Sequence, residues 1–248
     1  MSKYLFADLM RLLKRVPLWI VLGIYAAATV LILDISVSLS EGVTSVQMMS
    51  IASTMLELAP LTVGIMCVTL VYGDDFKSRI MQVAIGGGIS RNKIILMKLI
   101  ESAILSAFEI IVIILTSMIT SAVMGYPFAG TQVRDIFVEG FTILVMIIGY
   151  VSITQILMFL RQGTGLAVLL FISLSMGLIS ELFSLLELIK PLQKMHIGSY
   201  TFTSLSEVFA TRLALGHVNF GALIGVILYI GISFLLTALI YRKRELEF

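Results

Sequence analysis

The feature of this sequence that most constrains its fold is a series of apolar runs, each long enough to cross a lipid bilayer as a helix. The hydrocarbon core of a bilayer is about 30 Å thick, so a crossing helix needs about 20 apolar residues. Because backbone amides cannot stay unpaired in lipid, each crossing must be a helix or part of a closed barrel. Only 13% of the residues are charged, against about 25% in soluble domains. We therefore predict an all-α membrane protein.

Six runs qualify as spans, and together they form a single transmembrane domain over residues 1–248. The predicted spans cover residues 18–35, 55–73, 94–124, 136–160, 163–185 and 219–241. The third run is longer than one perpendicular crossing needs, so we expect it to tilt or to extend beyond the membrane. Residues 186–218 combine proline and glycine with apolar residues, which indicates either short helices in the outer leaflet or an ordered exterior loop.

Basic residues are divided unevenly between the two sides of this predicted membrane domain. Of the 17 lysines and arginines, 13 fall on one side and 4 on the other, which accounts for all 17. The four are Arg134, Lys190, Lys194 and Arg212. Because lysine and arginine stay on the cytoplasmic side, this asymmetry predicts that both termini lie in the cytoplasm.

Residues 2–16 predict an amphipathic helix that lies on the membrane surface. Apolar residues at helical spacing share one face, whereas Asp8, Arg11 and Arg15 share the opposite face. The cationic face suits anionic lipid of the inner leaflet, and Pro17 ends the helix before the first span. A secretory signal is the alternative interpretation of this basic start. The expected membrane-surface residues are Lys3, Phe6, Arg11, Lys14 and Arg15.

A polar stretch at residues 72–98, YGDDFKSRIMQVAIGGGISRNKIILMK, separates the second and third spans. Asp74 and Asp75 stand where a helix dipole favours negative charge, and apolar residues follow at helical spacing. We expect a short cytoplasmic helix, then a break at the three glycines 86–88, then Ser90 as the N-cap of the third span. The expected apolar face of the short helix contains Phe76, Ile80, Val83 and Ala84.

The glycines of this stretch do not form a nucleotide-binding motif. That motif needs Gly-Lys-Ser/Thr after four intervening residues, whereas here the glycines precede Ile89 and Arg91. The basic residues could serve only to fix the topology and to contact lipid phosphates. That interpretation leaves Asp74, Asp75 and the apolar face without a role.

Polar residues inside the predicted spans are candidates for a translocation path or for contacts between helices, because a carboxylate in lipid is costly. The candidates are Glu57, Glu109 and Gln155, of which Glu109 is the deepest. Small residues four apart predict close helix packing, within one subunit or between two. These pairs are Ser173 with Gly177 and Gly221 with Gly225.

Few residues of this sequence are candidates for a catalytic site or a metal site. His196 and His217 are the two histidines, and neither has metal-ligand spacing to a pair of carboxylates. Cys67 is the single cysteine, which excludes a disulfide within the chain. We expect neither a catalytic site nor a metal site, and we expect no cofactor bound by this chain.

The pattern of residues 75–98 resembles that of the permease subunits of ATP-binding-cassette exporters of the second type. That family has an acidic residue, a short apolar helix, a glycine, a Ser-Arg pair and a later lysine. The corresponding residues here are Asp75, Gly88, Ser90, Arg91 and Lys98. The entry helix and six spans are similar in topology over the whole chain. One departure is that relatives often carry Gly-Thr soon after the acidic residue, where this chain has Arg79 and Ile80.

The resemblance implies that residues 74–88 form a coupling helix and turn that dock on a separate ATPase. The implied coupling residues are Asp74, Asp75, Phe76, Lys77, Arg79, Ile80, Val83, Gly88, Ser90 and Arg91. It also implies two copies of the ATPase, a second permease chain, and ATP and magnesium held by the ATPase. A bacterial cytoplasmic membrane is the implied location.

Small members of this family that lack a large outer domain are similar to exporters of antimicrobial or toxin-type peptides, so we expect an amphipathic peptide as substrate. Lipids and hydrophobic drugs would fit such a path as well. Two other functions stay open at this point. One is a proton-coupled carrier that uses Glu109. The other is an immunity or scaffold protein that only sequesters a toxin in the membrane.

Overall fold

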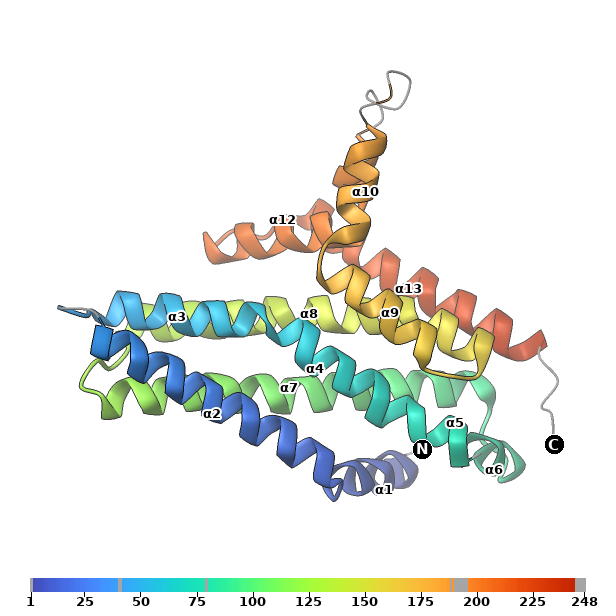
Figure 1. Ribbon diagram of the computed structural model, residues 1–248. Helices are drawn as coiled ribbons and strands as arrows, with labels where there is room; N and C mark the ends of the chain where they lie inside the picture. Colours follow the sequence, from blue (N-terminus) through green and yellow to red (C-terminus); the bar gives the residue numbers. More distant parts are fainter. Residues whose placement is uncertain (1, 40–41, 79, 188, 190–195, 244–248) are drawn as a thin grey trace.

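The computed structural model describes residues 2–39, 42–78, 80–187, 189 and 196–243, and every regular element in those ranges is a helix (Figure 1). The prediction of an all-helical protein is therefore confirmed for the part of the chain that the structure describes. The elements in order are α1 Ser2–Leu13, α2 Val16–Leu39, α3 Ser45–Glu57, α4 Ala59–Cys67, the π-helix η1 Val68–Gly73, α5 Asp74–Ser78, α6 Ile80–Gly86, α7 Arg91–Val123, α8 Gly130–Arg161, α9 Gly165–Ser175, α10 Leu178–Leu186, the 3-10 helix η2 Ile197–Tyr200, α12 Phe202–Ala214 and α13 Phe220–Lys243.

In the described ranges, five helical segments are long and apolar enough to cross a membrane, which indicates a multi-pass membrane protein. A sixth arises if α9 and α10, which bend by 66° at their junction, are taken together as one span. The five segments are Val16–Leu39, Ser45–Phe76, Arg91–Val123, Gly130–Arg161 and Phe220–Lys243.

The second segment begins ten residues before the predicted start at residue 55, because α3 carries its own helix start. Gln47 N–H donates to the Thr44 hydroxyl at 3.4 Å, and Thr44 N–H donates to the Gln47 side chain at 3.0 Å. This reciprocal pair is a capping box, which satisfies backbone donors at a helix N-terminus. Met48 and Ala52 then point into the core one turn apart. The helix therefore starts in a segment whose overall hydropathy is too low to predict a span.

The segment that was expected to span residues 163–185 is broken near Gly177. Gly177 has φ +71°, a left-handed conformation that other residues resist, and it separates α9 from α10. No residue of α10 is buried, and the helix projects away from the long helices (Figure 1). The short helices η2 and α12 follow it within residues 186–218, where short helices were one of two expectations.

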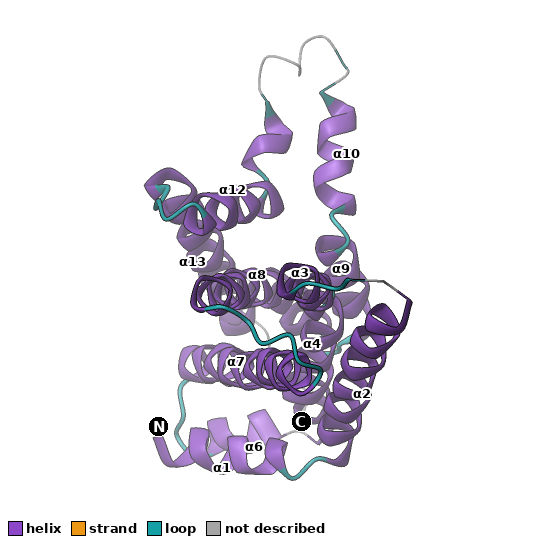
Figure 2. Ribbon diagram, turned by 90° about the vertical axis from the view of Figure 1, so that its left-hand side faces the viewer, coloured by secondary structure: helices purple, strands orange, loops and turns teal. Residues whose placement is uncertain are grey.

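The two long helices α7 and α8 form the centre of the bundle. In the view of Figure 2, α7 lies between α8 and the pair formed by α1 and α6. α8 packs on α13, α9 and α12 as well as on α7, and Gly149 lets α12 approach it closely. A Cβ atom at Gly149 would lie 1.8 Å from Cζ of Phe202. The apolar core is therefore continuous between α8 and the outer helices.

Candidate functional site

The short helices α5 and α6 lie at one end of the bundle, beside α1 (Figure 1). They follow directly on η1, and a π-helical turn holds more residues than an α-helical turn. The insertion of a π turn therefore changes which side chains of the following helix point inward. Tyr72 within η1 and Asp75 just after it are both fully buried.

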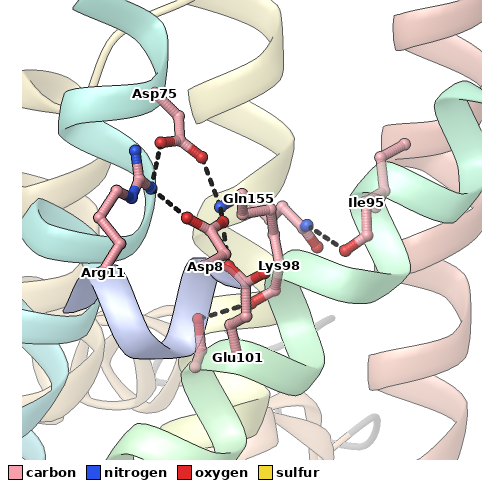
Figure 3. Close-up of polar contacts among 8 residues, drawn as sticks. Asp8, Arg11, Asp75, Ile95, Lys98, Glu101 and Gln155 are labelled. Carbon is pink, nitrogen blue, oxygen red and sulfur yellow. Dashed lines mark hydrogen bonds and ion pairs between the residues drawn. The ribbon is translucent and has the colours of Figure 1, made fainter. Parts of the chain in front are cut away.

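Asp75 belongs to a cluster of five charged side chains that joins α1, α5 and α7 (Figure 3). Arg11 Nη2 of α1 lies 2.5 Å from Asp75 Oδ1 and 2.6 Å from Asp8 Oδ1. Lys98 Nζ of α7 forms ion pairs with Asp8 and Asp75 and lies 2.7 Å from Glu101 Oε2. We call these residues the ion cluster: Asp8, Arg11, Asp75, Lys98 and Glu101.

The ion cluster is almost completely shielded from solvent. The side chains of Lys98, Asp75 and Glu101 are 0% exposed, whereas that of Arg11 is 25% exposed. Three carboxylates face two cations, so every charge has an opposite partner within ion-pair distance. Buried ions are costly to desolvate, and removal of one partner leaves another charge uncompensated. The cluster therefore resists separation of α1, α5 and α7.

A second ion pair extends the cluster toward the surface. Arg15 Nη1 lies 3.0 Å from Asp74 Oδ2, and both side chains are more than a third exposed. Such exposed pairs contribute only about 0–1 kcal/mol to stability. The connection between α1 and α5 is therefore carried mainly by Arg11 and Asp75.

The surroundings keep two side chains of α1, Arg11 and Tyr4, in their protonated forms. Burial alone lowers the pKa of Arg11, but the hydrogen bond and the negative charge of Asp75 outweigh burial and raise that pKa. Burial also raises the pKa of the Tyr4 hydroxyl to about 12. Arg11 thus stays positive, and Tyr4 neutral, throughout the physiological pH range.

The predicted coupling residues divide into an inward set and an outward set. Asp75 is buried, and the Phe76 ring packs edge-on against Phe159 with centroids 5.5 Å apart. Val83 of α6 is 73% exposed, and the glycine turn that follows it is exposed, with Gly88 at φ +87°. A partner at this end would therefore meet α6 and the glycine turn.

Other residues of that predicted set hold the ends of helices. Arg91 donates from Nη1 to the backbone oxygens of Tyr241 at 2.7 Å and Arg242 at 3.1 Å, which ties the start of α7 to the end of α13. Ser90 occupies the N-cap position of α7 but makes no side-chain cap bond. Ile80 is half-buried and Asp74 pairs with Arg15. Residue Arg79 and the side chains of Lys3 and Lys77 lie outside what the structure describes.

The predicted membrane-surface residues of α1 also separate. Phe6, Lys14 and part of Arg15 are exposed. We expected Arg11 to face lipid headgroups, but its guanidinium points into the ion cluster, where it lies between Asp8 and Asp75. The polar face of α1 therefore contacts the protein itself.

The polar residues predicted for the spans have three different environments. Glu57 is exposed, whereas Gln155 is buried and donates from Nε2 to the Ile95 backbone oxygen at 3.1 Å. Glu109 is 0% exposed, and neither carboxylate oxygen has a hydrogen-bond partner within the described part of the chain. Gln155 is thus held against α7 by the backbone of Ile95.

The small residues predicted for helix packing have different contacts. A Cβ atom at Gly225 would lie 2.8 Å from Leu205 Cδ1, so Gly225 packs α13 against α12 of the same chain. Gly177 forms the helix break described above, and Gly221 is exposed. The Ser173 hydroxyl donates to the Leu169 backbone oxygen at 2.9 Å within its own helix.

Lys98 falls among the basic residues of the predicted cytoplasmic side, and the ion cluster was not predicted. The signal lay in two pairs of opposite charges three residues apart, Asp8 with Arg11 and Lys98 with Glu101. Nothing in the sequence relates the two pairs to each other.

Among the described residues, no group of three or more histidine, cysteine or acidic side chains is placed to hold a metal ion. In comparisons with known proteins, the chain matches no protein-family model and no curated protein.

Proposed function

We propose that this chain is the transmembrane subunit of an exporter that is driven by a separate ATP-binding-cassette ATPase. The observation that carries the proposal is the ion cluster, which connects the exposed α5–α6 end of the bundle to α1 and α7. The resemblance of residues 75–98 to the permease subunits of such exporters supplies the class of partner. The long apolar helices supply the membrane domain.

Force applied to the exposed surface of α6 has a direct route into the membrane helices. α5 follows η1 and the second long segment without a turn, so a displacement of α6 also moves Asp75. Asp75 contacts Arg11 of α1 and Lys98 of α7. Because these buried pairs are costly to break, α1, α5 and α7 are expected to move as one unit. Their movement would change the packing of α7 on α4 and α8.

In this proposal, ATP and magnesium bind to two copies of the partner ATPase, and a second permease chain completes the translocation path. The chain would lie in a bacterial cytoplasmic membrane with both ends inside. The structure is compatible with this orientation because α1 and the end of α13 both lie beside the first turns of α7. An amphipathic peptide is the proposed substrate.

A proton-coupled carrier is the second candidate function, and one observation favours it. Glu109 is a fully buried carboxylate in the longest helix. Export by an ATP-driven complex would stop with a catalytic mutation in the ATPase and would survive collapse of the proton gradient. A carrier driven through Glu109 would show the opposite pattern in proteoliposomes.

Copurification tests the proposal at the level of the partner. The tagged chain is coexpressed with a candidate nucleotide-binding subunit from the same organism, and capture is compared between Val83→Asp and Val218→Asp. Both valines are exposed. Val83 lies on α6, near the C-terminal end of α13, whereas Val218 lies just before the N-terminal end of α13. We expect Val83→Asp to lose the ATPase and Val218→Asp to retain it. Equal capture by both variants would refute docking at α6.

A further inference from the structure

Among the residues that the structure describes, Glu109 differs from the other carboxylates of the bundle interior because it has neither a hydrogen-bond partner nor an ion-pair partner. Glu101 is paired with Lys98, and Glu139 accepts a hydrogen bond from the Ser53 hydroxyl at 2.6 Å. Glu109 is 0% exposed, and both of its oxygens are without a hydrogen bond. It is therefore the carboxylate whose charge the surrounding protein compensates least.

Among the described residues of the helices that pack against α7, the titratable side chains other than Cys67 are exposed, contact other groups, or lie beside the ion cluster as Tyr4 does. Asp8 and Arg11 of α1 belong to the ion cluster, as does Asp75 beyond η1. Other groups contact partners away from Glu109: Tyr25 with the Met55 backbone oxygen, Tyr72 with Phe159, Tyr150 with Thr203, Tyr229 with the Tyr200 backbone oxygen and Tyr241 with Arg91. The remaining charged groups on α2, α3, α8 and α13 are exposed: Asp34, Glu57, Arg134, Asp135, Arg161, Arg242 and Lys243.

One titratable group does lie near Glu109, and it is the thiol of Cys67 on α4. The Cys67 side chain is fully buried, and Glu109 contributes to its electrostatic surroundings. Cys67 Sγ lies 3.1 Å from the Ser106 hydroxyl, and Ser106 precedes Glu109 by three residues on the same face of α7. A neutral thiol cannot stabilise an ionised carboxylate as a cation would.

A carboxylate that is buried without a cation or a donor takes up a proton, because desolvation penalises only the charged form severely. We infer that Glu109 is a proton-binding site inside the closed bundle, and that it releases this proton when α4 and α7 separate and water enters. The step is the uptake of one proton by one carboxylate, with no other reactant. This inference does not depend on the partner ATPase, and its tests use the chain alone.

Linkage gives the direction of the pH effect. The closed packing holds the proton, whereas a hydrated glutamate ionises near pH 4.3, so the closed form binds more protons at neutral pH. A fall in pH therefore favours the closed packing of α4 on α7, and a rise in pH favours the open form. Cys67, the single cysteine, lies in this interface and reports its opening through its reaction with a small maleimide.

Infrared difference spectroscopy on the protein in phospholipid nanodiscs tests the proton directly. The spectrum of the wild type minus that of Glu109→Gln should show the C=O band of a neutral carboxylic acid at neutral pH. The matched control is Glu57→Gln, which removes an exposed carboxylate and should show only carboxylate bands. Carboxylate bands alone for Glu109 would overturn the inference. Glu109→Met serves in place of the glutamine variant if the amide does not fold.

Maleimide labelling of Cys67 tests the link to opening. In Glu109→Gln the labelling rate should rise with pH only through ionisation of the thiol. In the wild type it should rise more steeply, because opening releases one proton, so that the ratio of the two rates increases by up to about tenfold for each pH unit between pH 6 and pH 9. A ratio that stays constant over this range would show that the proton on Glu109 does not control the α4–α7 interface.

Discussion

Among the individual residues of the ion cluster, Lys98 forms the most ion pairs, because it faces three carboxylates from α1, α5 and its own helix. Its aliphatic chain and ammonium group are completely buried. Asp75 is equally buried, so a charge reversal at Asp75 would disturb the packing of α1 on α7 as well as any contact with a partner. Substitutions at exposed Val83 are the cleaner probe of docking.

Lys98→Met is expected to lower the free energy of unfolding by about 3–5 kcal/mol, because it leaves three buried carboxylates with Arg11 as their only cation in the cluster. Lys14→Met, which removes an exposed lysine just after α1, should change this free energy by less than about 0.5 kcal/mol. Unfolding in a denaturing detergent measures both. A similar small effect for the two variants would mean that the ion cluster does not stabilise the fold.

The exposed pair of Arg15 and Asp74 gives a second residue-scale prediction. Arg15→Ala should destabilise the protein by no more than about 1 kcal/mol, and the effect should shrink as salt is added, because exposed ion pairs are screened. Unfolding measured at low and high ionic strength checks this dependence. A large loss that is insensitive to salt would place Arg15 inside the cluster rather than at its edge.

Among the helices, the apolar runs were sufficient to predict the fold class and the positions of α2, α7, α8 and α13. The start of α3 was not predicted because its first turns mix polar and apolar residues, which lowers the mean hydropathy of the segment to that of a loop. The break between α9 and α10 was not predicted, because Gly177 fits the spacing of a small-residue packing pair and the sequence alone does not show its left-handed conformation. Hydropathy reports burial in lipid, and it carries little information about bends.

The close contact of α8 with α12 gives an element-scale prediction. Gly149→Ala should destabilise the bundle by about 1–3 kcal/mol, because the added methyl group overlaps the Phe202 ring. Gly231→Ala is the matched control, since Gly231 lies within α13 with no atom within 4 Å of its added Cβ. Equal stability of the two variants would indicate that α12 is loosely placed against α8.

In the whole molecule, the ion cluster and the Arg91 contacts place α1, α5 and the end of α13 around the first turns of α7. Both described ends of the chain therefore lie at one end of the bundle. The pairing of Asp8 with Lys98 could not be predicted from the sequence, because it depends on how α1 folds back under α7. The uneven distribution of basic residues predicts that this end is cytoplasmic.

Thiol labelling from the two sides of the membrane tests this orientation. In a Cys67→Ser background, Val83→Cys should react with an impermeant maleimide only from the cytoplasmic side and Val218→Cys only from the opposite side. The comparison uses inside-out vesicles and intact cells. Labelling of both positions from the same side would contradict the arrangement of α6 and α13 at opposite ends.

The most direct test of the central claim is ATP hydrolysis stimulated by substrate in a complex of this chain and its ATPase, reconstituted in proteoliposomes. Val83→Asp is compared with Val218→Asp in the same lipid. We predict that Val83→Asp abolishes both the stimulation and the peptide export, whereas Val218→Asp retains both. Full stimulated hydrolysis and export by Val83→Asp, or export by the chain without any ATPase, would contradict the claim that α6 receives the force of a partner.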